Sequence, residues 1–300
     1  MHYTKQPIDY PEQIAMLRQR GLIISDEEYA IRQLGIISYF RLASYWRPME
    51  SDKITHIFKP KSTFENAVSL YYFDKHLRAL LFKVVQSIEI ALRTKVIHHI
   101  GMKYGAFWFA DESLAKNPHM FAGNLTHIQS ELSRSREDFI LEHNTKYSNP
   151  PYPPVWKTLE VVSFGTLSKL LENFSDRSVK KIIASEFNLP HRKFLESWIK
   201  SISVIRNYIA HHARVWNRKY PYKPLMPQRL PNKWIDVNNI REEKLYAQLC
   251  VLKYLEDAIH PHNRFALEMK NLIQSYSNVD VAAMGFPSDW ETQPLWATSD

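Results

Sequence analysis

The chain lacks residues on which several classes of protein depend. Its 300 residues include one cysteine, Cys250, which excludes an internal disulfide and a cysteine-rich zinc site. No apolar run approaches the roughly 20 residues that span a bilayer, and the polar start Met1–Lys5 lacks the apolar segment of a secretory signal. We therefore expect a cytoplasmic protein without a membrane partner, in which Cys250 is a small buried hydrophobe.

Several catalytic and cofactor-binding motifs are also missing. The chain has no P-loop, no glycine-rich phosphate loop and no serine-centred nucleophile elbow, which disfavours ATP-driven and acyl-transfer chemistry. The pairs His98-His99 and His260-Pro-His262 lack the i, i+4 spacing of a helical zinc pair and a companion carboxylate motif. We expect solvated histidines there, with no metal site and no cofactor.

Glycine is scarce, at 7 residues, and the longest periodic segments follow helical spacing, which predicts an all-α fold. The clearest segment is a core helix from Thr63 to about Ile100. The hydroxyls of Ser62 and Thr63 and the early carboxylate of Glu65 suit its N-terminus. Its apolar residues recur at three- and four-residue steps: Leu70, Phe73, Leu77, Leu80, Leu81, Val84, Val85, Ile88, Leu92 and Val96.

The rest of the chain predicts shorter helices separated by proline-rich segments. A charged region at 121–147 indicates an exposed helix or hairpin, and the proline cluster at 149–154 ends it. Further helices are expected at 155–174, 179–187, 192–215 and 242–276, with a loop of four prolines at 221–231.

Three parts are expected along the chain. Residues 1–58 predict an N-terminal subdomain of two or three short helices, too few for a core of their own and therefore packed on the main bundle. Residues 59–276 form the main helical domain, and residues 277–300 form an irregular tail.

The net charge of +8 favours polyanionic partners, because neutralising phosphates releases condensed counterions. Charge alone does not name the partner. It gains weight beside residues 206–218, which contain three arginines, two asparagines and two adjacent histidines. A guanidinium holds a phosphate bidentately, and an imidazole with an unperturbed pKa of about 6.5 moves protons near neutral pH. Together these groups suffice to cleave RNA without a metal.

The same residues resemble a known family. Arg206-Asn207-x-x-x-His211 resembles the R-x(4 to 6)-H signature of HEPN-type ribonucleases, and residues 206–218 resemble the corresponding block of the Abi-like (AbiD/AbiF) abortive-infection family. Other segments are similar to that family in the same order: Leu17–Ile24 with Ile37–Tyr45, Tyr72–Arg78 with Ile88–Arg93, Trp156–Ser168 and Met284–Trp290.

The resemblance implies a HEPN-like helical bundle, a role in phage defence, and a homodimer that places two copies of the motif across its interface. In an ideal helix, residues five apart are rotated by about 140°, so Arg206 and His211 do not share one face. The reach of the arginine, unwinding between His211 and Arg214, or pairing of two subunits would bring them together. The resemblance implies the third.

We expect an endoribonuclease mechanism. His211 acts on the 2′-hydroxyl or the leaving 5′-oxygen, and Arg206 holds the scissile phosphate and stabilises the charge of the transition state. Asn207 orients His211 or the phosphate. The products are a 2′,3′-cyclic phosphate and a 5′-hydroxyl, and DNA is spared. His212 also fits the looser spacing, so the active histidine is either His211 or His212.

Supporting or RNA-binding roles are expected for His212, Arg214, Arg218, Glu89 and Arg93. The last two lie four apart on the long helix, where they either support the helix or contact the site. Without the resemblance, Arg206 is expected to be a surface salt-bridge partner. The two histidines are then solvated residues at a helix end, and Arg214 and Arg218 are ordinary C-terminal cations.

Three functions remain open at this point. The first is the nuclease, and the second is an RNA-binding protein that holds a structured non-coding RNA with weak, gated or absent catalysis. The third is a helical scaffold that only dimerises. The expected partners are an RNA substrate, a second copy of the chain, and an associated non-coding RNA or an antitoxin.

Overall fold

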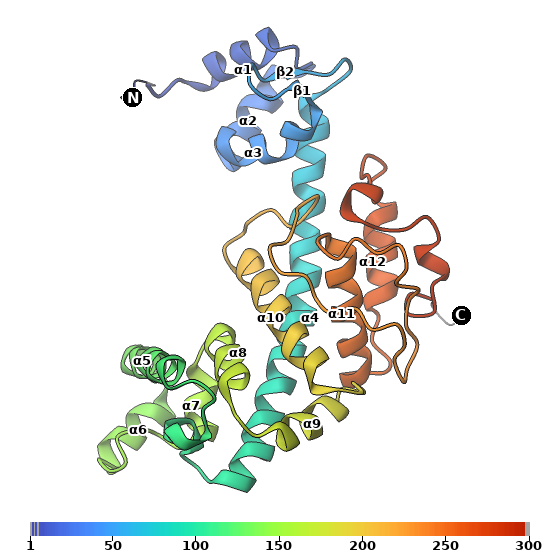
Figure 1. The fold of residues 1–300 in the computed structure, drawn as a ribbon. Helices are drawn as coiled ribbons and strands as arrows, with labels where there is room; N and C mark the ends of the chain where they lie inside the picture. Colours follow the sequence, from blue (N-terminus) through green and yellow to red (C-terminus); the bar gives the residue numbers. More distant parts are fainter. Residues whose placement is uncertain (1, 3, 5, 298–300) are drawn as a thin grey trace. The chain divides into compact units, whose positions relative to one another are not determined.

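The computed structural model describes residues 2, 4 and 6–297 and is 62% helical. Within these residues, twelve α-helices and one two-stranded sheet make up the regular structure, apart from short 3-10 turns (Figure 1). The expected all-α fold is confirmed. Cys250 is fully buried on a helix, as its sequence context predicts.

The chain divides into two compact units. The first comprises the residues up to Ala79 together with Met269–Val281, and the second comprises Leu80–Glu268 together with the residues from Ala282 onward. The division falls inside two helices, α4 (Phe64–Tyr104) and α12 (Phe265–Gln274). The sequence instead predicts a boundary after residue 58.

The first unit gathers three short helices and a hairpin around the start of α4. Asp74 is its buried polar centre, where a carboxylate oxygen accepts a hydrogen bond from the Tyr45 hydroxyl at 2.6 Å and pairs with Arg78. The end of α12 and the residues that follow it belong to the same unit, where the Tyr276 hydroxyl lies 2.8 Å from Nδ1 of His76. The elements are α1 (Tyr10–Gln19), α2 (Glu27–Ile37), α3 (Tyr39–Trp46), β1 (Glu50–Asp52) and β2 (Ile57–Phe58), with the two strands antiparallel.

The second unit holds the remaining helices. α10 packs against α8, α9 and α11, and it buries Trp198, Ile202 and Ile205. These contacts fix the helix that carries Arg206. The elements are α5 (Pro118–Arg134), α6 (Asp138–Lys146), α7 (Val155–Val161), α8 (Phe164–Asn173), α9 (Arg177–Ser185), α10 (Arg192–Ala210) and α11 (Leu245–Ile259).

α4 confirms the predicted long helix and its start. The hydroxyl of Thr63 accepts a hydrogen bond from the backbone N–H of Asn66 at 3.0 Å, which satisfies one of the free N–H groups of the first turn. The early carboxylate of Glu65 accepts a hydrogen bond from the Ser25 hydroxyl at 2.6 Å instead. The helix then runs past the predicted Ile100 to Tyr104.

Three predicted helices were wrong in their extent. The helix expected at 155–174 is two helices, α7 and α8, because Ser163 begins a new one. Its hydroxyl accepts from the N–H of Thr166 at 3.3 Å, and its own N–H donates to Glu131 at 3.1 Å. The helix expected at 242–276 is also two, α11 and α12, because Pro261 has no N–H to continue the ladder. The helix expected at 192–215 ends at Ala210.

The charged region expected as a helix or hairpin forms α5 and α6. The C-terminal tail packs through aromatic rings and two 3-10 turns, Ala282–Met284 and Trp290–Thr292. Its Trp296 ring stacks on Tyr246 with a centroid distance of 6.1 Å. Residues 298–300 of the predicted tail lie outside the described residues.

Candidate functional site

Arg206 lies on α10 beside a carboxylate of α4. Its side chain is about one-third exposed, and its Nε lies 3.8 Å from Oε2 of Glu89. The other carboxylate oxygen of Glu89 accepts a hydrogen bond from Nη2 of Arg93 at 2.7 Å. One carboxylate therefore stands between two guanidinium groups, and the structure brings together three of the residues that the sequence singled out.

Arg93 joins this group to a third helix. Its side chain is buried, and it donates to the backbone carbonyls of Leu159 and Val162, the second at 3.2 Å. Both carbonyls belong to the C-terminal end of α7, where a helix leaves its last acceptors without intrahelical partners. Arg93 thus supplies the donors that the end of α7 needs while it holds Glu89 in place.

A cavity of about 260 Å³ opens beside the three charged residues. α4 provides most of its wall, α7 contributes Glu160, and α10 contributes Arg206. A second hollow of about 710 Å³ also includes Glu160 and lies against the turn between α5 and α6. The cavity is lined by Phe82, Val85, Gln86, Glu89, Ile90, Arg93, Glu160 and Arg206.

The two histidines lie just past the last turn of α10, and both are exposed. His211 is the C-cap, and His212 follows it in the left-handed region at φ +53°. The N–H of His212 donates to the carbonyl of Ile209 at 3.0 Å, and that of Ala213 donates to the carbonyl of Tyr208 at 2.8 Å. These two bonds define a Schellman motif, which explains why the helix ends here.

Arg206 and His211 leave α10 in different directions within one copy of the chain. α10 is helical through Ala210, so the two side chains leave its axis about 140° apart. No hydrogen bond joins either residue to the other in the part of the chain that the structure describes. The side chain of Asn207 is exposed and likewise makes no hydrogen bond to His211 there.

The last two arginines of the block brace the segment that follows α10. The guanidinium of Arg218 lies 3.9 Å from the centre of the Tyr208 ring, and its Nη1 donates to the carbonyl of Arg214 at 2.9 Å. Arg214 lies 5.9 Å from the ring centre of Trp216. Both arginines are half-buried, so part of each stays accessible.

Four residues of the cavity were not predicted from the sequence. Phe82, Gln86 and Ile90 are four residues apart on α4 and fall outside the apolar periodicity of the core. Phe82 and Ile90 are therefore apolar residues outside the core pattern, and this was the signal in the sequence that could have identified them. Glu160 lies within a segment that carries the family resemblance, but no role was expected for it.

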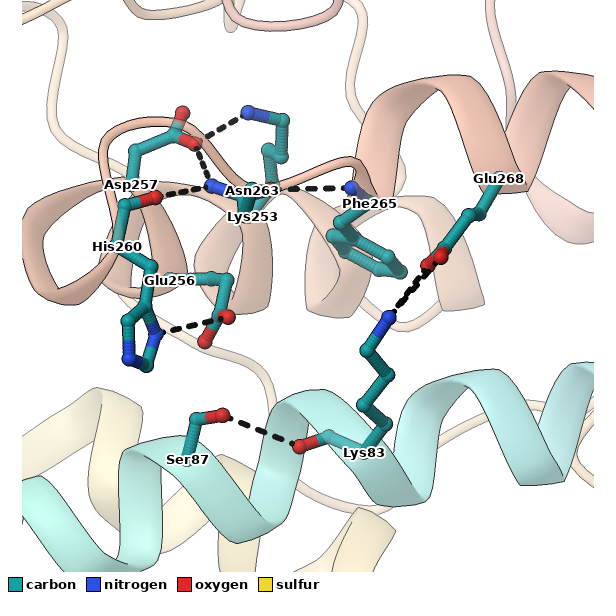
Figure 2. A network of polar contacts seen from close by, with 9 residues as sticks. All are labelled: Lys83, Ser87, Lys253, Glu256, Asp257, His260, Asn263, Phe265 and Glu268. Atoms are coloured by element: carbon teal, nitrogen blue, oxygen red, sulfur yellow. Dashed lines mark hydrogen bonds and ion pairs between the residues drawn. The ribbon is translucent and has the colours of Figure 1, made fainter.

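Figure 2 shows the surroundings of His260, one of the histidines considered for a metal. Its Nδ1 lies 3.2 Å from Oε1 of Glu256, whose pKa is raised by burial although His260 acts to lower it. The adjacent Asp257 pairs with Lys253 and accepts a hydrogen bond from Asn263 at 2.6 Å (Figure 2). In the described part of the chain, no group of three or more His, Cys, Asp or Glu residues is placed to hold a metal ion.

Comparison with known proteins adds one match. A family described as Abi-like protein matches residues 32–217, which is more than half of the 300 residues and includes Glu89, Arg93, Arg206 and His211. No curated protein and no solved structure matches the chain. Among the residues that the structure describes, no helix has both the length and the apolar character needed to cross a membrane.

Proposed function

The chain belongs to the family of Abi-like proteins, and from this premise we propose that it acts in abortive infection, a defence against phage, as a metal-independent endoribonuclease of the HEPN type. The observation that carries the proposal is the position of Arg206. It is one-third exposed at the edge of a cavity, beside a carboxylate that a buried arginine holds in place. A guanidinium in that position can bind a phosphate because part of the side chain is already exposed.

The proposed reaction is transesterification followed by release of the downstream strand. One imidazole takes the proton of the 2′-hydroxyl, and the 2′-oxygen forms a bond to phosphorus as the bond from phosphorus to the 5′-oxygen breaks. A second imidazole gives a proton to that 5′-oxygen. The products are a 2′,3′-cyclic phosphate and a 5′-hydroxyl. Arg206 stabilises the charge that builds on the phosphoryl oxygens.

Two imidazoles and a phosphate-holding arginine imply a second copy of the chain. His211 and Arg206 leave α10 in different directions, so a homodimer that sets two α10 helices against one phosphodiester supplies the missing groups. Glu89 and Arg93 are proposed to support the site, because Glu89 lies 3.8 Å from Nε of Arg206 and accepts a hydrogen bond from Arg93. Arg214, Arg218 and His212 are proposed to hold the flanking RNA.

The central test is cleavage of labelled RNA in EDTA. The wild type should yield 2′,3′-cyclic phosphate ends, and Arg206→Ala should lower the rate by about 10²- to 10³-fold, as removal of a transition-state donor does. His211→Ala should lower it by about 10²- to 10⁴-fold. Lys193→Ala on the exposed face of α10 and His127→Ala on α5 serve as matched controls and should leave the rate unchanged. Cleavage that survives both Arg206→Ala and His211→Ala would reject this site.

A second candidate function is an RNA-binding protein whose catalysis is weak, gated or absent. The separation of Arg206 from His211 within one copy favours it, because a single chain then offers phosphate-binding groups without a complete acid–base pair. RNA that copurifies with the wild type and remains intact under every condition tested would support this second function.

A further inference from the structure

We propose that the cavity beside Arg206 is a nucleobase pocket that favours bases with an exocyclic amino group. This inference rests on the proposed function and deepens it, because it assigns the residues that choose which RNA sequence is cut. Phe82 and Ile90 would hold the face of the base, and Glu160 would read its edge. The adjacent phosphate would then lie within reach of Arg206.

Exposed apolar residues form the wall where a base would stack. Phe82 is 50% exposed and Ile90 is 57% exposed, and Gln86 lies midway between them on α4. Steps of four place all three on one side of the helix. Single-stranded RNA is recognised by stacking unpaired bases on such aromatic faces. Phe82 is the aromatic residue of this cavity, so it is the stacking platform.

The polar lining favours a base that donates hydrogen bonds. Both oxygens of Glu89 face arginines, one at 2.7 Å and the other at 3.8 Å, so two guanidinium groups already balance its charge. Glu160 lines the same cavity from α7, and it is exposed. An ionised carboxylate only accepts hydrogen bonds. Adenine, cytosine and guanine each offer an exocyclic amino group to Glu160. Uracil has none, and its N3–H lies between two carbonyl oxygens that an ionised carboxylate repels.

The cavity also leaves room for the rest of the strand. Glu160 borders the second hollow as well, where Arg134 and Arg136 lie on the turn between α5 and α6. The carboxylate of Glu131 in that hollow already accepts hydrogen bonds from the N–H of Ser163 at 3.1 Å and the hydroxyl of Thr166 at 3.2 Å. Arg134 and Arg136 lie in this hollow together with Glu137 and Glu160, and they are the two groups there that can hold a flanking phosphate.

The test uses four RNA oligonucleotides that carry one A, C, G or U beside the single cleavable bond, on a background of 2′-O-methyl residues. For the wild type, kcat/KM should be about tenfold lower for U than for the three amino-bearing bases. Glu160→Gln should remove most of this difference, because an amide also donates. Phe82→Ala should lower kcat/KM on the order of tenfold for every base, and Phe82→Tyr should restore it.

The control is Met102→Ala, which removes an apolar side chain that is 80% exposed on the same helix and outside the cavity. It should behave as the wild type. A wild-type enzyme that cuts all four oligonucleotides equally, or a preference that Glu160→Gln leaves intact, would overturn the pocket. A change of oligomeric state in Phe82→Ala, measured by light scattering, would also overturn it by assigning the face to contacts between copies.

A binding measurement separates this inference from the proposed function. Fluorescence anisotropy with the same four sequences, 2′-O-methylated throughout and therefore uncleavable, reports base preference without catalysis. The wild type could fail to cleave and still bind the U oligonucleotide about tenfold more weakly than the other three. That result would reject the proposed nuclease activity and support the nucleobase pocket. Binding that is absent, or equal for the four bases, sinks the pocket whatever the enzyme assay shows.

Discussion

At the scale of single residues, His212 occupies a conformation that usually belongs to glycine. Its φ of +53° lies in the left-handed region, where a side chain costs roughly 1–2 kcal/mol relative to glycine, although histidine is among the residues found there more often than most. The chain therefore holds an imidazole where the Schellman motif favours no side chain at all. A histidine at such a position is expected where its imidazole has a functional role.

This conformation separates the two candidate histidines experimentally. His212→Gly should raise the free energy of unfolding by about 1 kcal/mol in urea titrations, because it relieves the left-handed backbone. If His211 is the active residue, the same variant should keep its rate of cleavage at saturating RNA, because His212 is proposed only to hold the flanking strand. His212→Ala retains the Cβ atom and should give no such gain in stability. A loss of cleavage in both variants would instead make His212 the active histidine.

The local contacts of the site can be predicted from the sequence, whereas the contacts between distant segments cannot. The i, i+4 spacing of Glu89 and Arg93 predicts their ion pair, which is present at 2.7 Å. The approach of Arg206 to Glu89 depends on the packing of α10 against its neighbours, which no local pattern encodes. The end of α10 could not be predicted for a different reason, since the glycine that usually marks a helix end is absent at His212.

At the scale of elements, α9 is fastened to α4 by a carboxylate at each end. Asp176 at its N-cap accepts hydrogen bonds from Lys103 at 2.6 Å and from the Tyr104 hydroxyl at 2.8 Å. Glu186 at its C-cap lies 2.7 Å from both Lys95 and His99. The three basic residues recur every four positions along α4 and so share one face.

Both carboxylates titrate below their ordinary range. The hydrogen bond from Lys103 is the main cause that lowers the pKa of Asp176 below 3.8. Burial acts to raise the pKa of Glu186, but hydrogen bonds from Lys95 and His99 outweigh it and bring the pKa below 4.5. A carboxylate with a lowered pKa in the folded state contributes stability above its unfolded pKa, and this contribution is lost as the pH falls through the folded pKa.

The stabilising effect of this fastening should therefore disappear in acid. The double variant Asp176→Asn, Glu186→Gln should have a lower free energy of unfolding than the wild type at pH 7, measured in urea. The difference should shrink as the pH falls below about 4. Glu142→Gln, an exposed change on α6, serves as the control. A difference that stays constant from pH 7 to pH 3 would contradict the assignment.

The sequence predicts which segments are helical more readily than it predicts where each helix ends. Apolar periodicity over α4 predicts most of its core face, because local spacing determines that pattern. The prediction leaves out Phe64, Ala67, Val68 and Ile100, which are buried, and includes Leu80, which is half-buried. The break between α7 and α8 depends on Glu131, a residue about thirty positions away that accepts the N–H of Ser163. Such a contact exists only once α5 has packed beside α8.

At the scale of the whole molecule, the proposed site is complete only when two copies meet. His211→Ala should be inactive alone. When equal amounts of His211→Ala and wild type are mixed and exchange subunits, every mixed dimer lacks one of the two imidazoles, and only about a quarter of all dimers keep both. Activity should then fall to about half of that shown by the same amount of wild-type protein alone. Activity that stays at the full level, with subunit exchange demonstrated by labelled subunits, would place the site within one chain.

Composition and periodicity predict the helical class of the molecule, whereas its division into two compact units has no counterpart in the local sequence pattern. The predicted boundary after residue 58 follows the end of the short helices. The structure groups the first part of α4 and the end of α12 with the N-terminal residues instead. A helix that serves two units has one continuous apolar pattern, so its sequence carries no mark at the point of division.

The position of Arg93 has a consequence for how such a protein can evolve. The same guanidinium holds the carboxylate beside Arg206 and secures the end of the helix that bears Glu160. Under the roles proposed above, the rate of RNA cleavage and the base preference both depend on Arg93. New base preferences should then arise through substitutions in the cavity wall. Replacement of Arg93 would instead impair both the rate of cleavage and the base preference.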